Sequence, residues 1–161
     1  MGRKKWSSGW AAEWLWSAEE MRWRRTFSGN ADQVTAARRF ARTLFAGAAC
    51  AEVVEFAVAE LAANTLRHTR SRDEGGWFGV ELVYDDPAYV AVTDIGGGGV
   101  PAVRQDLEEL SEGGRGLYAL SQLAISLGIH GSRTLGHTVW ADIDLDQPLE
   151  APPGLGLQLT S

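Results

Sequence analysis

The sequence predicts a single α+β domain. Its 161 residues are enough for one hydrophobic core and too few for two comfortable domains. The hydrophobic content of 45% and the charged content of 22% are typical of a soluble globular protein. Segments with helical and with strand periodicity both occur, but they do not follow the strict strand–helix–strand alternation of a parallel sheet. An α+β fold is therefore expected.

The first half of the domain is expected to contain one strand and two long helices. Residues 20–29 alternate enough to form a strand, and Asn30 is expected to cap the helix that follows. The two helices are predicted over 31–47 and 51–69, because apolar residues recur every three or four positions in both segments.

The second half is expected to contain two pairs of strands, a loop and a helix. A short Asp-Pro-Ala turn between the first two strands indicates an antiparallel hairpin. The loop is rich in glycine and acidic residues, and a helix is expected to begin after its last glycine cluster. The predicted elements are strands over 77–85 and 89–95, a loop over 96–116, a helix over 116–128 and closing strands over 126–132 and 137–145.

Composition and charge exclude several classes of protein. The net charge of −6 argues against a general nucleic-acid binder. Cys50 is the only cysteine, which rules out an intramolecular disulfide and a cysteine zinc site. No apolar run has the length of a membrane helix, so no membrane span is expected. The basic opening is not followed by a cleavage-type segment, and a cytoplasmic protein is expected.

Glu60, Asn64 and His68 form the first group of candidate functional residues. They are spaced four apart, so they share one face of the second helix. That face is otherwise apolar, and a carboxylate and a carboxamide on it need partners. Asn64 offers an oxygen ligand for Mg²⁺, which usually accompanies phosphates, and Glu60 can accept a proton from a nucleophile. A solvated helix edge is the alternative interpretation, because this spacing is common by chance.

The second group lies in the stretch VTDIGGGGVP. Asp94 ends a strand, and Gly96 and Gly98 follow in a D-x-G-x-G pattern. The carboxylate can accept a hydrogen bond from an exocyclic amine such as N6 of adenine, and bare glycine lets the backbone approach a flat base. A strand that ends in a glycine turn is the alternative. A dinucleotide-binding fingerprint is excluded by context, since Pro101 interrupts it and no parallel strand follows directly.

The third group is the stretch EGGRG, in which Gly114 and Gly116 flank Arg115. The free N–H groups at the start of the following helix make a phosphate site by geometry and dipole, and the guanidinium of Arg115 suits phosphate oxygens. A flexible loop that caps a helix is the alternative. Lys4 and Lys5 are the only lysines, so a Walker A phosphate loop and the eukaryotic-type kinase fold are excluded.

Taken in this order, the three groups resemble the GHKL ATPase superfamily. The resemblance is carried by the helical E-x-x-x-N, the D-x-G-x-G at a strand end, the G-x-G that opens a helix and the stretch GHTVW in a late strand. Within the superfamily, the chain is most similar to the small bacterial anti-sigma-factor serine/threonine-protein kinases. The resemblance covers about residues 22–146, which leaves a Trp-rich extension over 1–21 and a flexible tail over 147–161.

The resemblance implies a two-layer sandwich of a mixed, mainly antiparallel sheet against helices (the Bergerat-type fold), with ATP held between the helices and a lid. It implies that Glu60 is the general base, that Asn64 binds Mg²⁺ and that Asp94 reads adenine. Arg115 is expected beside the phosphates. The resemblance also matches glycines under the base, glycines near the phosphates and a threonine that supports the aspartate: Gly96, Gly98, Gly114, Gly116 and Thr138.

Two functions follow from the resemblance. In the first, the protein is a kinase that transfers the γ-phosphoryl group of ATP to a serine of an anti-sigma-factor antagonist. In the second, it is a nucleotide-gated binding module that sequesters a sigma factor or another regulator with little catalysis. The expected partners are therefore an antagonist or a sigma factor, with no direct contact to nucleic acid, and a homodimer is left open.

Overall fold

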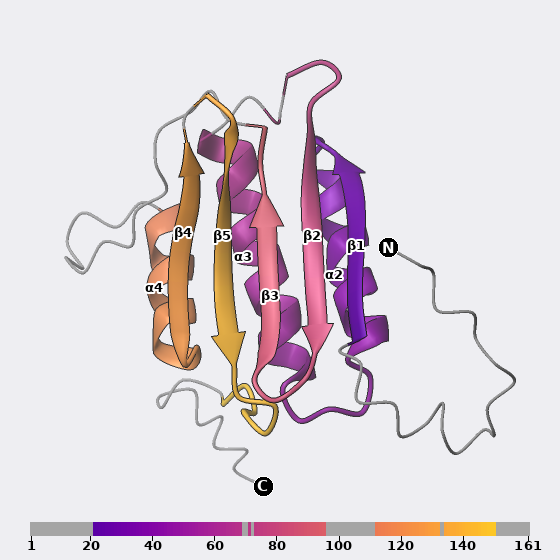
Figure 1. The fold of residues 1–161 in the computed structure, drawn as a ribbon, viewed down its shortest axis with the longest axis vertical. Coiled ribbons are helices and arrows are strands. Elements are labelled where there is room, and N and C mark those ends of the chain that lie inside the picture. The colour runs from indigo at the N-terminus through magenta and orange to yellow at the C-terminus, as the bar shows by residue number, and fades with distance from the viewer. Residues whose placement is uncertain (1–20, 69–70, 72, 96–111, 133, 151–161) are drawn as a thin grey trace, which may run out of the picture.

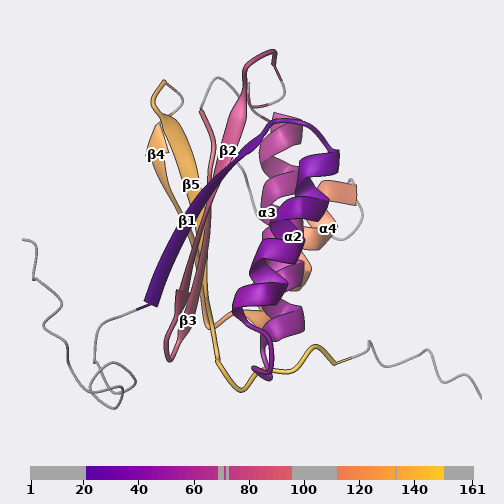
Figure 2. The same ribbon diagram turned by 90° about the vertical axis from the view of Figure 1, so that its right-hand side faces the viewer.

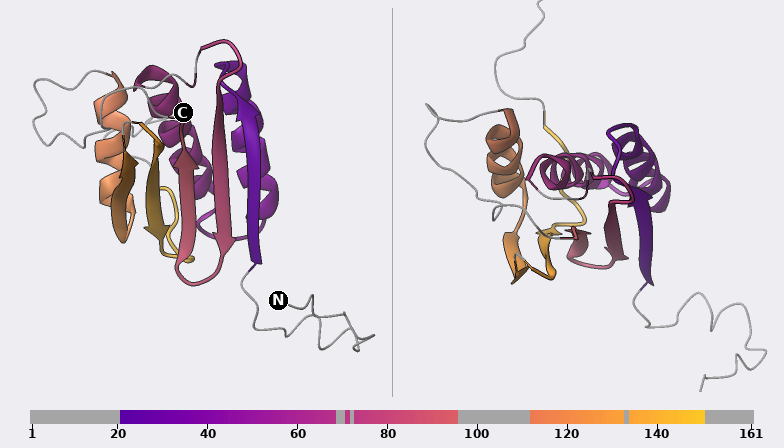
Figure 3. Two further views of the ribbon diagram at one scale, coloured as in Figure 1. Left: turned by 45° about the horizontal axis from the view of Figure 1, so that its top comes forward. Right: turned by 90° about the horizontal axis from the view of Figure 1, so that it is seen from above.

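The computed structural model describes residues 21–68, 71, 73–95, 112–132 and 134–150. Over these residues, five strands form one sheet and three helices cover one of its faces (Figure 1, Figure 2). Helix α3 lies between α2 and α4 in a single layer (Figure 3). The elements in chain order are β1 (Met21–Ser28), α2 (Asp32–Leu44), α3 (Ala51–His68), β2 (Trp77–Tyr84), β3 (Ala88–Thr93), α4 (Glu112–Leu123), β4 (Ser126–Ser132) and β5 (Gly136–Ile143).

All four strand pairings in the described part of the sheet are antiparallel. The strand order is β1-β2-β3-β5-β4, so β5 lies between β3 and β4. The predicted two-layer α+β fold is confirmed, whereas the parallel pair that a mixed sheet requires is not found among these strands. The hairpins β2–β3 and β4–β5 account for two of the pairings, because a tight turn produces antiparallel neighbours.

Helix α4 begins earlier than the sequence predicts. It starts at Glu112, so the glycine cluster lies inside its first turns and not before them. Glycine in a helix costs about 1 kcal/mol relative to alanine, which is why sequence reasoning places the cluster in the loop. Packing of α4 against α3 offsets this cost. Helix α2 also differs at its start, where the N-cap is Ala31 in place of Asn30 and no side chain caps the helix.

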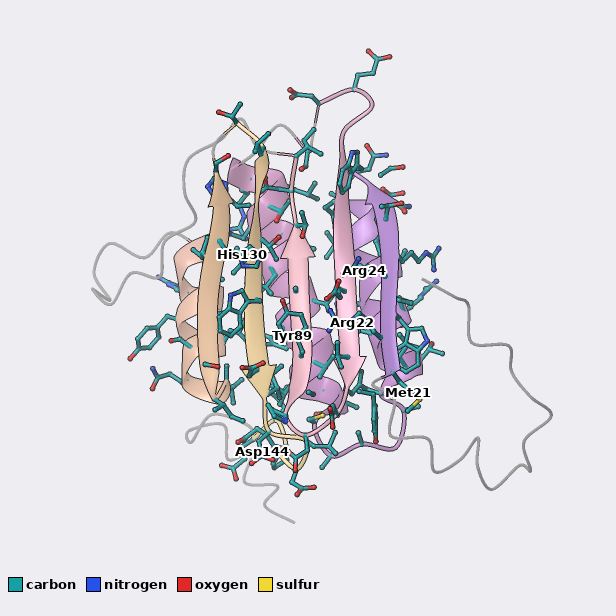
Figure 4. All side chains as sticks on the ribbon, viewed as in Figure 1. Met21, Arg22, Arg24, Tyr89, His130 and Asp144 are labelled. Atoms are coloured by element: carbon teal, nitrogen blue, oxygen red, sulfur yellow. The ribbon has the colours of Figure 1, made fainter. Side chains whose placement is uncertain are left out.

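The hydrophobic core lies between the helices and one face of the sheet. In β3 and β5 every second residue is buried against the helices, among them Val90, Val92, Val139 and Ala141. The intervening residues point to the opposite face, which no helix of the described part covers (Figure 2). Figure 4 looks onto this open face and labels four of its residues, Arg22, Arg24, Tyr89 and His130.

Backbone hydrogen bonds fix the direction of the helices relative to the sheet. The N–H of Cys50, just before α3, donates to the carbonyl oxygen of Leu145 at 3.2 Å. The N–H of Ile125, just after α4, donates to the carbonyl oxygen of Asp142 at 2.8 Å. The start of α3 and the end of α4 therefore lie where β5 finishes. The last turns of α3 and the first turns of α4 lie towards the opposite end, where β3 ends and β5 begins (Figure 1).

Candidate functional site

Glu60 and Asn64 lie on adjacent turns of α3, as their spacing predicts. Asn64 is only 2% exposed, and Glu60 is partly buried. Because α3 packs against both neighbouring helices and the sheet, the polar residues Asn64 and Thr65 on its covered side are withdrawn from water. His68 is the last residue of α3, and its side chain lies outside the described part of the structure.

Gly116 of α4 lies directly against the carboxylate of Glu60. A Cβ atom added to Gly116 would overlap both Oε2 and Cδ of Glu60. Only glycine leaves room for the carboxylate at this contact between α3 and α4. The fold thus brings together two predicted site residues that are far apart in the sequence.

Burial raises the pKa of the Glu60 carboxyl above the ordinary range of glutamate, and the positive charge of Arg67 offsets part of this effect. A carboxylate with a raised pKa is a stronger base than an exposed glutamate. Shifts of this kind are concentrated at functional sites, so the pKa of Glu60 supports its assignment as a proton acceptor.

Asn64 has a buried amide nitrogen, Nδ2, without a hydrogen-bond partner in the described part of the chain. The two ends of an amide have nearly the same shape, so a half-turn of this group places Oδ1 there instead. Over the described residues, no group of three or more His, Cys, Asp or Glu side chains is arranged to hold a metal. A Mg²⁺ ion would therefore take one oxygen from Asn64 and the others from phosphates and water, which fits its usual coordination.

Asp94 directly follows β3 and is 2% exposed. Its Oδ1 accepts a hydrogen bond from the backbone N–H of His137 at 3.1 Å. Its own N–H donates to the carbonyl oxygen of His137 at 2.9 Å. The N–H of Ile95 donates to Ser71 Oγ at 3.4 Å. These bonds hold the carboxylate at the end of the sheet towards which the last turns of α3 point.

Thr138 lies on the open face of the sheet, away from the helices. Its hydroxyl oxygen is 2.7 Å from that of Thr93, and both residues line a hollow on that face. This placement does not agree with the expectation that Thr138 supports Asp94 on the nucleotide side. The physical reason is the two-residue period of a strand, which puts Thr138 on the face opposite to that of His137.

His137 is the candidate residue that sequence reasoning missed. It is 5% exposed and lies on the helix-covered face beside Asp94. Its Nδ1 atom has no hydrogen-bond partner among the described residues. Side chains alternate between the two faces of a strand, so His137 lies on the same face as the buried Val139 and Ala141. This two-residue period is the sequence signal that places His137 on the helix-covered face.

The start of α4 supplies backbone groups. Gly114 and Arg115 lie in its first turn, where the first four N–H groups have no partner within a helix. Gly116 lies one position further on, so its N–H belongs to the regular helix and its role at the site is the close approach to Glu60. Arg115 is exposed. Gly96, Gly98 and the part of the predicted lid over 96–111 lie outside the described part of the structure, whereas its last residues, 112–116, are helical.

Residues 27–143 match the family model of the histidine kinase-like ATPase domain. The match covers well over half of the chain, so the protein belongs to this family of GHKL-type ATPase domains. Domains of this kind bind ATP, usually with Mg²⁺, and the chain is accordingly an ATP-binding domain of a regulatory type. No curated protein gives a significant match to the chain. Within the part of the chain that the structure describes, no helix is long and apolar enough to cross a bilayer.

Replacing Glu60 by glutamine should raise the melting temperature at neutral pH. The raised pKa means that the folded state binds the proton more tightly than the unfolded state, so the ionised carboxylate lowers stability above its folded pKa. The advantage of Glu60→Gln should therefore shrink as the pH falls from that pKa towards the ordinary pKa of glutamate. Thermal melts across this range measure the difference.

Glu74→Gln is the matched control, because Glu74 is exposed in the turn before β2. It should leave the melting temperature close to that of the wild type at every pH. A Glu60→Gln protein that melts below the wild type at neutral pH would show that the carboxylate stabilises the fold and is not a desolvated base.

Proposed function

We propose that this protein is an ATP-dependent protein serine/threonine kinase of the anti-sigma-factor type. It transfers the γ-phosphoryl group of ATP to a serine of an anti-sigma-factor antagonist. The observation that carries the proposal is the environment of Glu60, a partly buried carboxylate with a raised pKa that packs against Gly116. It lies one turn from Asn64, whose Nδ2 has no hydrogen-bond partner among the described residues. A proton acceptor beside a cation ligand is what phosphoryl transfer to a hydroxyl requires.

Each group has a separate task in this reaction. The carboxylate of Glu60 accepts the proton of the serine hydroxyl as the oxygen attacks the γ-phosphorus, and the bond from this phosphorus to the β–γ bridging oxygen breaks to release ADP. Asn64 holds Mg²⁺, which offsets the charge on the phosphates when it is bound. The free N–H groups in the first turn of α4 and the guanidinium of Arg115 bind phosphate oxygens. Asp94 accepts a hydrogen bond from the adenine amine and so fixes the other end of the nucleotide.

The partner is inferred from the resemblance of the motif set to the small anti-sigma-factor kinases. A nucleotide-gated module that binds a sigma factor with little catalysis uses the same ATP site but does not need a working base. Glu60 favours the kinase, because burial penalises its charged form and the charge of Arg67 offsets this only in part. None of the ion pairs found among the described residues includes its carboxylate.

ADP should bind with Mg²⁺ at least about tenfold more tightly than GDP. Asp94 accepts from the 6-amino group of adenine but faces the 6-oxo acceptor of guanine, and unmatched buried polar groups cost about 1–3 kcal/mol. Asp94→Asn should weaken ADP binding by a similar factor without unfolding the domain, since asparagine keeps an Oδ1 for the N–H of His137. Calorimetry measures these affinities, and equal affinities for ADP and GDP would contradict the adenine-reading role.

Glu60→Ala and Glu60→Gln should keep the affinity for ATP, but their rate of phosphoryl transfer should fall by a factor of about 10²–10⁴, because a general base acts mainly in the transition state. The assay incubates the protein with ATP, Mg²⁺ and candidate antagonist proteins and detects phosphoserine by mass spectrometry. Transfer at the wild-type rate by either variant would reject Glu60 as the base. If wild-type protein binds its partner in an ATP-dependent way but makes no phosphoserine, the binding module is the correct function.

Gly116→Ala should fold normally and transfer phosphate slowly. The added methyl group takes the space of the Glu60 carboxylate, which is the end of a flexible side chain and can turn away without separating α3 from α4. The rate should fall towards that of the Glu60 variants while the melting temperature changes little.

Gly79→Ala is the matched control for this change, because a Cβ there lies at an ordinary 3.5 Å from the Trp77 ring. It should transfer phosphate at the wild-type rate. If Gly116→Ala is equally active, the contact between Gly116 and Glu60 does not position the base.

A further inference from the structure

His137 lies directly across from Asp94 on the neighbouring strand. The register of β3 and β5 pairs Thr93 with Thr138, which makes Asp94 and His137 the next pair towards the end of the sheet. The backbone bond of 2.9 Å between them and the 3.1 Å bond from His137 N–H to Asp94 Oδ1 close this pair. Opposite residues of an antiparallel pair have Cβ atoms about 4.5–5.5 Å apart, so the imidazole and the carboxylate are neighbours on the helix-covered face.

The imidazole of His137 is nearly withdrawn from water but has an unpaired nitrogen. The residue is 5% exposed, and Nδ1 finds no partner among the described residues. The other buried side-chain atom without a partner in the described part is Nδ2 of Asn64, on α3. Buried polar atoms are nearly always hydrogen-bonded in folded proteins. Two unpaired ones on facing layers at the same end of the domain indicate a ligand with hydrogen-bonding groups.

We propose that His137 contacts the nucleotide base, with its Nδ1–H donating a hydrogen bond to N1 of adenine. The inference rests on the proposed adenine-reading role of Asp94. Adenine presents the N6 donor and the N1 acceptor side by side on one edge. The strand pair holds a carboxylate acceptor and an imidazole donor side by side. The carboxylate matches the N6 donor of adenine, and the imidazole matches the N1 acceptor. His137 thereby performs the second half of the recognition that Asp94 begins.

Thr138 is the competing candidate, because the resemblance of the motifs assigns it to the support of the aspartate. Its side chain points to the open face and its hydroxyl is 2.7 Å from that of Thr93. The sheet itself separates that hydroxyl from the helix-covered side. A residue on the open face does not reach a base that lies beside Asp94. Substitution of His137 should therefore affect binding of the base, whereas substitution of Thr138 should not.

A chemical double-mutant cycle tests the contact, with ADP and 1-deaza-ADP as ligands and calorimetry as the measurement. In 1-deaza-ADP a C–H group replaces N1, so the ligand loses only the proposed acceptor. Wild-type protein should bind 1-deaza-ADP about 3- to 10-fold more weakly than ADP, the range of one neutral hydrogen bond. His137→Ala should bind both ligands with the same reduced affinity, because the two changes remove the same interaction.

His137→Asn extends the test and also serves if the alanine variant fails to fold. The asparagine Nδ2 takes nearly the position of the imidazole Nδ1, so this variant should still prefer ADP over 1-deaza-ADP. Thr138→Val should keep both the affinity for ADP and the preference of the wild type.

Three results would overturn the inference. If His137→Ala still discriminates against 1-deaza-ADP as the wild type does, His137 does not contact N1. If Thr138→Val abolishes the discrimination, the contact belongs to Thr138. If wild-type protein binds neither ADP nor 1-deaza-ADP, the proposed nucleotide function itself fails. This result differs from normal ADP binding in which the preference for ADP does not depend on His137, which would reject only the contact with N1.

Discussion

The pairing of β5 with β3 is the constraint on which the site depends. β5 closes the sheet by inserting between β3 and β4, so the end of β3 meets the start of β5. This pairing holds the Asp94 carboxylate through the backbone of His137 at a point where a glycine-rich stretch follows and offers no side chains. It also sets the position of α4, because that helix leads into β4, which pairs with the other edge of β5. The end of the sheet that holds Asp94 and the Glu60–Gly116 contact are thus both fixed by one strand.

The contact between α3 and α4 contains two features that lower stability. A carboxylate there loses hydration, and the pKa of Glu60 rises as a result. The same contact excludes a side chain at Gly116 and so retains glycine in a helix, where it is unfavourable relative to alanine. Neither feature strengthens the fold. Both are expected where activity is maintained at the expense of stability, which is a common property of active sites.

Local patterns predict most of the elements, and the exceptions have physical reasons. The strands and the two long helices follow from their periodicity, as β2 and α3 show. The true start of α4 is not accessible from propensity, because packing of α4 against α3, which is distant in the sequence, offsets the unfavourable glycines. Residue type selects Thr138 in β5, whereas the two-residue period selects His137 for the helix-covered face. The strand order joins segments that are far apart in the sequence, and local patterns do not encode such contacts.

The polar groups on the two faces of the sheet find their partners in different ways, and this difference favours the helix-covered face as the side that binds the nucleotide. On the open face, Glu81 pairs with both Arg22 and Arg24, and water is available to the groups around them. On the helix-covered side, Nδ2 of Asn64 and Nδ1 of His137 are withdrawn from water and lack hydrogen-bond partners within the described residues. Leaving such atoms unpaired is unfavourable, and a nucleotide brings acceptors and donors on its base and oxygens on its phosphates. At the proposed site, a nucleotide that bonds to these atoms would remove this penalty. A ligand that binds only the folded state stabilises it in proportion to the logarithm of its concentration, so nucleotide binding should also strengthen the fold.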